Sequence, residues 1–105
     1  MTATTTLHSR ADVTTAAPAR YAKQLVSHLS RKVAFTTDGD TSTVRLGEAT
    51  GQVVVGDDVL VLLASGPDQE AVAQVEDVLG RHLERFGARD GPTVHWTRGT
   101  PEATP

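Results

Sequence analysis

The side chains with the clearest capacity for chemistry in this sequence are its four histidines, because the chain has no cysteine. His28 and His82 stand out among them. Segments 25–31 and 79–85 share leucine, histidine, leucine and arginine at the same offsets. Imidazole nitrogens bind zinc, copper, iron and haem iron. The pair therefore predicts a metal or cofactor site, with iron, haem or zinc as the candidates.

Two imidazoles alone do not complete a coordination sphere. His95 would be a distant third ligand, and Asp77 and Glu84 are candidate carboxylate helpers. In the competing interpretation the two histidines bind nothing, and each closes the edge of the core and hydrogen-bonds a neighbour. The sequence leaves both interpretations open.

Basic side chains near these histidines predict other chemistry. Arg31 and Arg85 each follow one of the two histidines by three residues. They could receive an anionic ligand such as a siderophore or another carboxylate; the alternative is a solvated helix surface. Lys32 falls near the apolar stripe of the first helix, and partial burial there would suit Schiff-base chemistry. A lysine at a helix end otherwise extends into water, so we assign no catalytic residue.

Composition excludes several classes of protein. The chain has 105 residues, a net charge of -3 and 38% hydrophobic residues, which favours one globular domain and argues against nucleic-acid binding. Its longest apolar run, Val59–Ala64, is far shorter than the roughly 20 residues of a membrane helix. The first residues lack the pattern of a secretory signal. We therefore expect a soluble, cytoplasmic domain with no nucleic-acid or membrane partner.

Apolar spacing predicts two helices that carry the candidate residues. The first spans about Ala17–Arg31, and the second runs from an N-cap at Asp68 to a terminal Gly87. Alternating segments separated by turn signals such as Asp38-Gly39 predict strands. The predicted strands are Ser9–Thr15, Val33–Phe35, Ser42–Leu46, Gln52–Val55, Val59–Ala64 and Pro92–Thr97, with a turn at Gly47–Gly51.

The predicted order is strand, helix, four strands, helix, strand, and the short turns favour antiparallel pairing. One sheet with two long helices on one face is the economical packing of these elements. The fold class we predict is therefore a two-layer α+β sandwich. We expect a single domain over residues 8–98, with disordered tails at 1–7 and 99–105.

The matching helix segments suggest two halves related by a pseudo-twofold axis. Ser42–Leu46 and Pro92–Trp96 would then be equivalent strands. Each of the two histidines lies about 60° to the same side of the leucine three residues before it, at about 100° per residue. Both imidazoles therefore face the seam between the helices, or both face away, and they meet only in the first arrangement.

The second face of the sheet is predicted to be partly apolar. Val54, Leu60 and Leu62, or their neighbours in another register, cannot all point at the helices. Exposed apolar sheet surface usually marks an interface. We therefore expect a homodimer, or docking on a partner protein, through this face, with a substrate groove there as the lesser alternative.

Three segments of the chain carry a family resemblance: Arg20–His28, His82–Asp90 and Val94–Trp96. They resemble a bacterial family of domains of unknown function, DUF2218, and the similarity extends over about His8–Trp96. Many relatives have Cys-x-His in the first helix and a further histidine three residues later. This chain has Val26, His28 and Arg31 at those positions, which weakens any metal site built on the additional ligands.

The resemblance implies a small bacterial domain whose relatives in part accompany siderophore-interacting proteins and in part carry an aldolase label. We expect a non-catalytic accessory or ligand-binding domain, linked to iron or siderophore metabolism by that resemblance. The alternative is a small enzyme, metal-dependent through His28 and His82 or an aldolase-type lyase through Lys32. An enzyme predicts a concave pocket with a histidine or lysine at its base. A binding module predicts a histidine pair packed in the seam and an apolar interface, and a structural dimer predicts no pocket.

Overall fold

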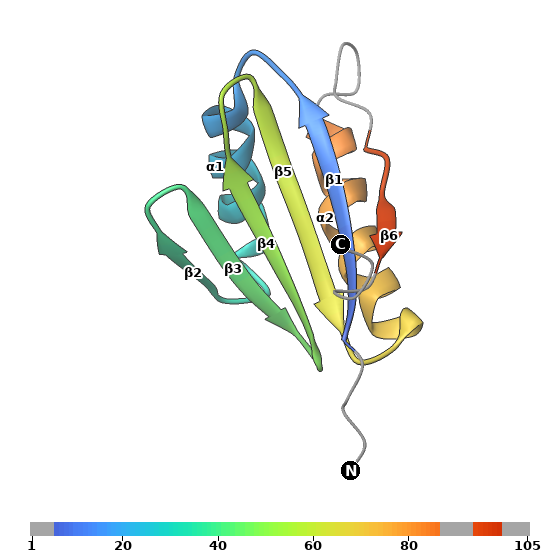
Figure 1. Cartoon of the computed structure of the whole chain (residues 1–105). Coiled ribbons are helices and arrows are strands. Elements are labelled where there is room, and N and C mark those ends of the chain that lie inside the picture. Colours follow the sequence, from blue (N-terminus) through green and yellow to red (C-terminus); the bar gives the residue numbers. More distant parts are fainter. Residues whose placement is uncertain (1–5, 87–93, 100–105) are drawn as a thin grey trace.

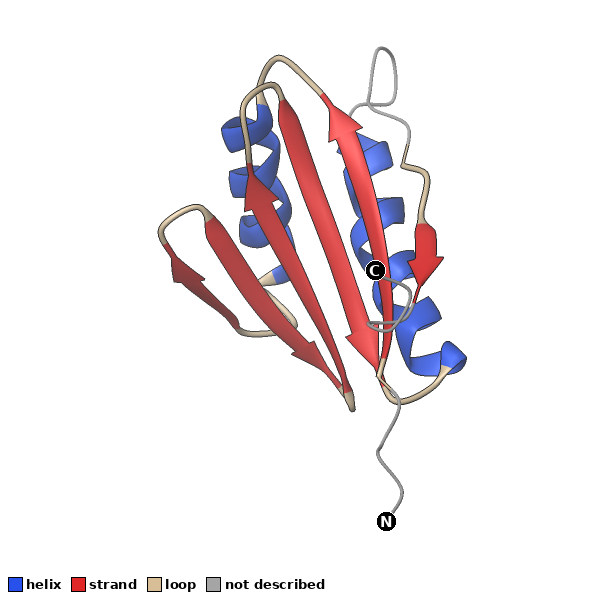
Figure 2. Ribbon diagram, in the orientation of Figure 1, coloured by secondary structure: helices blue, strands red, loops and turns tan. Residues whose placement is uncertain are grey.

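Six strands and two helices make up the part of the chain that this computed structural model describes, residues 6–86 and 94–99. Both helices cover one face of the sheet and leave the other face open, so the fold is the predicted two-layer α+β sandwich (Figures 1 and 2). The predicted order of elements is confirmed. In chain order they are β1 (Leu7–Thr14), α1 (Pro18–Leu29), β2 (Phe35–Asp38), β3 (Thr41–Leu46), β4 (Ala49–Val55), β5 (Val59–Gly66), α2 (Gln69–Phe86) and β6 (Thr97–Gly99).

The strands are ordered β2-β3-β4-β5-β1-β6 and every neighbouring pair is antiparallel. The predicted turn at Asp38-Gly39 is confirmed as the β2–β3 hairpin, with Gly39 at φ +62°. The predicted turn over Gly47–Gly51 is wrong in extent, because β4 already begins at Ala49. Gly47 has a φ of +63°, and a tight hairpin loop with a left-handed residue matches the twist of the paired strands.

Buried and more exposed residues alternate along the strands, so the sheet has one buried face and one open face. In β5, Leu60 and Leu62 point at the helices and are fully buried, whereas Val61 and Leu63 are half-buried on the other face. From the sequence, Leu60 and Leu62, or their neighbours, were expected on the open face. In the structure the neighbours Val61 and Leu63 lie there. The helix residues that complete the core are Ala22, Leu25, Leu29, Val72, Val75, Leu79 and Leu83.

The two halves of the fold are related, but through different strands than expected. β1 and β5 are antiparallel neighbours, and each leads into a helix on the same face of the sheet (Figure 1). β4 lies beside β5 and runs parallel to β1, just as β6 lies beside β1 and runs parallel to β5. The predicted equivalence of Ser42–Leu46 with Pro92–Trp96 is wrong, because β3 runs opposite to β4. The repeat relates β1-α1-β4 to β5-α2-β6, with β2 and β3 inserted in the first half.

The last predicted strand lies further along the chain than its apolar alternation indicated. The prediction was Pro92–Thr97, whereas β6 spans Thr97–Gly99 and Val94–Trp96 belongs to no strand. Residues 92 and 93, like the predicted terminal Gly87 of the second helix, lie outside the described residues. Val94 and Trp96 are half-buried against the core instead. Packing on α2, rather than a place in the sheet, accounts for their apolar character.

The segment 94–98 runs along the side of α2. Three contacts join every second residue of the segment to every fourth residue of the helix: Val94 with Glu84, Trp96 with Gly80, and Arg98 with Glu76. Four residues of a helix rise about 6 Å, and two residues of an extended chain span about 6.6 Å. The contact residues of the segment and of the helix are therefore spaced at nearly equal distances, so all three contacts form at once. These contacts help to hold β6 beside β1.

Gly80 is the position on α2 that lets the indole ring approach. A Cβ atom at Gly80 would lie 3.0 Å from Nε1 of Trp96 and 3.4 Å from Cγ1 of Val94. We expect Gly80→Ala to displace Trp96, because overpacking costs about 1–3 kcal/mol and exceeds the roughly 1 kcal/mol that alanine adds in helix propensity. Since Trp96 is the only tryptophan, its fluorescence should shift to longer wavelength. Gln74→Ala, at an exposed position of α2, should leave the emission unchanged; an unshifted spectrum for Gly80→Ala would contradict the contact.

The ion pair at the end of this segment has a predictable pH dependence. Nη2 and Nε of Arg98 donate to the carboxylate of Glu76 at 2.7 and 3.0 Å, and these bonds lower the pKa of Glu76 below its ordinary value of 4.5, against the opposing effect of burial. The hydroxyl of Ser9 also lowers this pKa, although it is buried without a hydrogen bond of standard geometry in the described part of the chain.

A lowered carboxyl pKa adds stability that is fully present above the unfolded-state value and is lost as the pH falls through the folded-state value. We therefore expect Glu76→Gln to lower the free energy of unfolding at pH 7 and to resemble the wild type once the pH is well below 4.5. Urea unfolding followed by circular dichroism at both pH values measures this difference. Asp77→Asn, which breaks the exposed pair with Arg81, should change little at either pH. A Glu76→Gln effect that persists in acid would refute the assignment.

Candidate functional site

The two helices bring His28 and His82 together in the seam between them. Their ring centroids are 5.2 Å apart and the ring planes are inclined by 46°. α1 and α2 run in opposite directions on the sheet (Figure 1), so equivalent flanks of the two helices face each other. Each histidine follows a fully buried leucine, Leu25 or Leu79, by three residues. The structure therefore has the first of the two arrangements predicted from the repeat, in which the imidazoles meet.

The two imidazoles differ in their surroundings. His82 is half-buried, and its Nδ1 lies 2.6 Å from the backbone oxygen of Val78. A carbonyl oxygen only accepts, so Nδ1 carries the proton and the lone pair of the neutral ring is on Nε2. This kind of second hydrogen bond orients a metal-binding histidine. His28 is exposed, so a small ligand can reach the pair from solvent.

The separation of the rings is compatible with one shared metal ion. An imidazole nitrogen lies about 2.0–2.1 Å from bound zinc and about 1.1 Å from its own ring centroid, so two imidazoles on a tetrahedral ion have centroids roughly 5 Å apart. Two axial ligands on opposite sides of a haem iron would be separated by roughly 6.3 Å between centroids. The observed 5.2 Å is thus closer to the tetrahedral case.

The carboxylates and the third histidine named in the sequence do not join this pair. Asp77 binds Arg81 at 3.0 Å, and Glu84 accepts a hydrogen bond from the backbone N–H of Val94. His95 lines a hollow on the open face of the sheet. Within residues 6–86 and 94–99, no three histidine or acidic side chains lie close enough together to hold a metal ion. The pair therefore offers two ligands and leaves the other coordination positions open.

The basic candidates are all exposed. Arg31 lines a shallow hollow of about 500 Å³ together with His28, whereas Arg85 lies one turn beyond His82 on α2. Lys32 is exposed, because α1 ends at Leu29 and Lys32 lies in the turn that follows, so the alternative of partial burial does not hold. An exposed amine lacks the desolvation that activates a Schiff-base lysine.

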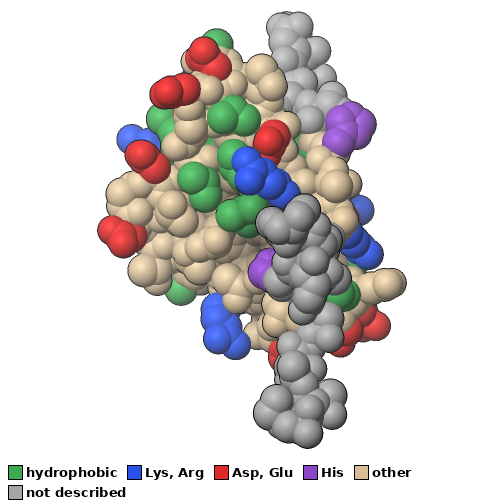
Figure 3. Space-filling model, viewed as in Figure 1, with side chains coloured by type: hydrophobic (Ala, Val, Ile, Leu, Met, Phe, Trp, Pro, Cys, Tyr) green, Lys and Arg blue, Asp and Glu red, His purple; other side chains and the backbone are tan. Residues whose placement is uncertain are grey.

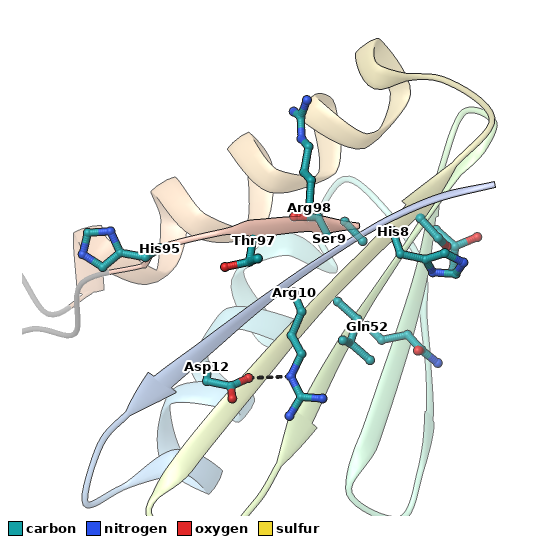
Figure 4. Close-up of a pocket in the computed structure, with 12 residues that line it drawn as sticks. His8, Ser9, Arg10, Asp12, Gln52, His95, Thr97 and Arg98 are labelled. Atoms are coloured by element: carbon teal, nitrogen blue, oxygen red, sulfur yellow. Dashed lines mark hydrogen bonds and ion pairs between the residues drawn. The ribbon is translucent and has the colours of Figure 1, made fainter. Parts of the chain in front are cut away.

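A second concave site lies on the open face of the sheet, where the sequence predicted a substrate groove only as the lesser alternative, without identifying the residues that line it. This open-face hollow has a volume of about 640 Å³, and Figure 4 shows how its side chains project from the strands. Its principal lining residues are His8, Arg10, Asp12, Thr50, Gln52, Leu63, Ser65, His95 and Thr97. The available signal was the alternation in β1, where exposed polar residues alternate with buried small ones. What the sequence did not show was which other strands lie beside them.

Fold and site together define a small α+β domain with a histidine pair between its helices and a hollow on its open sheet face. The chain belongs to DUF2218, described as uncharacterised proteins conserved in bacteria, and the match covers residues 10–97. The NMR structure of PA4090 from Pseudomonas aeruginosa has the same fold, with a TM-score of 0.73 and 21% sequence identity over 87% of this chain and 95% of that chain. No curated protein matches this sequence.

Proposed function

We propose that this domain is a non-catalytic accessory module that binds a divalent transition-metal ion through His28 and His82. The observation that carries the proposal is the 5.2 Å separation of the two ring centroids. The hydrogen bond from His82 to Val78 supports it, because that bond leaves Nε2 as the ligating nitrogen. Imidazole suits zinc, iron and copper among such ions.

The coordination positions that the protein leaves open would be filled by water or by a small chelating molecule. Arg31 and Arg85 lie near the two histidines in sequence and are exposed, so they favour an anionic chelator over a neutral one. A siderophore or another carboxylate chelator meets that description. The proposal includes a link to iron or siderophore metabolism, and that link rests on the family resemblance. A lyase that acts through Lys32 has no observation in its favour, since that side chain is exposed.

Titration of the metal-free protein with Co²⁺ and Zn²⁺ tests the proposal. We expect saturable heat by calorimetry and visible absorption bands with Co²⁺, and we expect both to be lost in the double variant H28A/H82A. His8→Ala removes an exposed histidine on another part of the surface and serves as the matched control, which should bind as the wild type does. Haem is added in a parallel absorbance titration. Equal Co²⁺ binding by the wild type and the double variant, or no binding by either, would overturn the proposal.

The open face of the sheet carries the second part of the proposal, an interface with another chain. Val54, Val59 and Val61 are half-buried on this face, and Figure 3 shows hydrophobic side chains exposed there among polar ones. A homodimer or a partner protein that covers these residues is the interaction we propose. Sedimentation velocity of the purified domain at rising concentration measures self-association, and Val61→Thr should weaken it by removing apolar surface. A monomer at all concentrations would leave only the partner protein.

A further inference from the structure

The composition of the open-face hollow follows from cross-strand register. Arg10 of β1 pairs with Leu63 of β5, and Leu63 pairs with Gln52 of β4. On the other side of β1, Arg10 pairs with Thr97 of β6. Side chains of paired residues lie on the same face of a sheet. One row of residues therefore crosses the hollow, with an apolar side chain between two polar ones.

One adjoining row carries hydrogen-bonding groups on three strands, whereas the other carries Asp12 followed by the apolar Val61 and Val54. His8, Ser65 and Thr50 are paired across β1, β5 and β4 on one side of the row, and Asp12 lies on the other side. His95 stands at the edge (Figure 4). An apolar floor with a few polar groups converging on it is typical of small-molecule sites, as is a volume within about 300–1,000 Å³.

Arg10 is the charged group best placed to recognise a ligand. Its Nε donates to Oδ1 of Asp12 at 2.7 Å (Figure 4), and this bond fixes the direction of the guanidinium. The ion pair engages Nε alone, and the side chain of Arg10 is 61% exposed. The terminal nitrogens of a guanidinium form two parallel hydrogen bonds to a carboxylate. Asp12 therefore orients Arg10 without occupying the terminal edge that an anion would use.

We infer that the open-face hollow is a binding site for a small organic anion with an apolar body, such as an aromatic carboxylate. The carboxylate bonds to the terminal nitrogens of Arg10, and the apolar body rests on Leu63. Gln52 stands on the far side of that body, held by its Nε2 hydrogen bond to Thr43 at 3.3 Å. This site uses no residue of α1 or α2 and lies on the opposite face of the sheet, so it is independent of the proposed metal site.

Sodium 1-naphthoate is a suitable probe, and its neutral analogue 1-naphthamide isolates the contribution of the charge. We expect a ¹H–¹⁵N correlation spectrum of the labelled protein to show saturable shifts at amides of β1, β4, β5 and β6 when naphthoate is added. The amides around His28 and His82 should not move. Naphthamide should bind at least about tenfold more weakly, because it forms no charge-assisted pair.

Two variants and a matched control complete the test. Arg10→Gln should weaken naphthoate binding at least about tenfold and leave naphthamide binding unchanged, while Leu63→Thr should weaken both. Arg45→Gln replaces another exposed arginine of the open face, outside the hollow, and should bind as the wild type does. H28A/H82A should retain full binding, which separates this site from the metal proposal. Equal affinity for the two probes, undiminished binding by Arg10→Gln, or shifts confined to other elements would each overturn the inference.

Discussion

Leu62→Ala is expected to lower the free energy of unfolding by about 2–5 kcal/mol, the range for leucine deletions that leave a cavity. Leu62 is fully buried at the centre of β5, between Ala11 of β1 and Val53 of β4. Both neighbours are small, so little side-chain volume is available to fill the space. Domains of this kind are stabilised by only about 5–15 kcal/mol in total. Urea unfolding at pH 7, followed by circular dichroism, measures the loss.

The neighbouring residue on the same strand provides the control. Leu63 points to the open face and is half-buried, so Leu63→Ala removes the same atoms where solvent already reaches them. We expect it to cost about 1 kcal/mol, since less apolar surface returns to water. The difference between the two variants depends only on which face of β5 each side chain occupies. Equal losses would mean that the register of β5 is wrong.

His82→Ala alone is expected to weaken Co²⁺ binding by about 100-fold or more. Loss of a residue that merely supports a metal ligand commonly costs about 10–100-fold, and His82 is proposed as a ligand itself. Its ring is also held in one orientation, because Nδ1 lies 2.6 Å from the backbone oxygen of Val78. Calorimetric titration with Co²⁺ gives the affinity, and the visible bands report the change in coordination.

Comparison of the single variants tests whether the histidines act as a pair. If one ion is shared, His28→Ala and His82→Ala each remove one of two ligands, and the double variant should bind scarcely more weakly than either. If each histidine bound its own ion, the wild type would bind two ions and each single variant would bind one. The stoichiometry of the wild-type titration therefore distinguishes a shared ion from independent sites. Full affinity in either single variant would contradict the proposed pair.

Local sequence patterns were sufficient to predict the type and order of the elements of this fold, although not the position of β6. Leucines and valines at helical spacing identified both helices, and Asp38-Gly39 identified the β2–β3 hairpin. These features depend on neighbouring residues only, because a helix turn or a hairpin loop is closed within a few positions of the chain. The sequence also predicted on which flank of its helix each of His28 and His82 lies. A rotation of about 100° per residue fixes the angle between each histidine and the buried stripe.

Part of the candidate site was therefore predictable. The repeat of leucine, histidine, leucine and arginine indicated that the two imidazoles either meet or both face away. It could not choose between these arrangements, because the choice depends on which sides of α1 and α2 face each other across the sheet. The sequence left open whether Lys32 is buried, for a similar reason. Burial of Lys32 against the apolar stripe would require a helix that continues past Leu29, whereas α1 ends there and Lys32 is exposed.

The tertiary structure alone decided the arrangements that join distant parts of the chain. It placed β1 between β5 and β6, set Val94 and Trp96 against α2, and assembled the open-face hollow from four strands. Periodicity gives the face on which a side chain lies but not the strand that lies next to it, since strand order is set by burial of the whole core rather than by any one segment. By itself, then, the sequence determined the helices, the first hairpin and the flanks of the histidines. Packing of both helices on one sheet decided that His28 and His82 meet and that Arg10, Leu63 and Gln52 stand side by side.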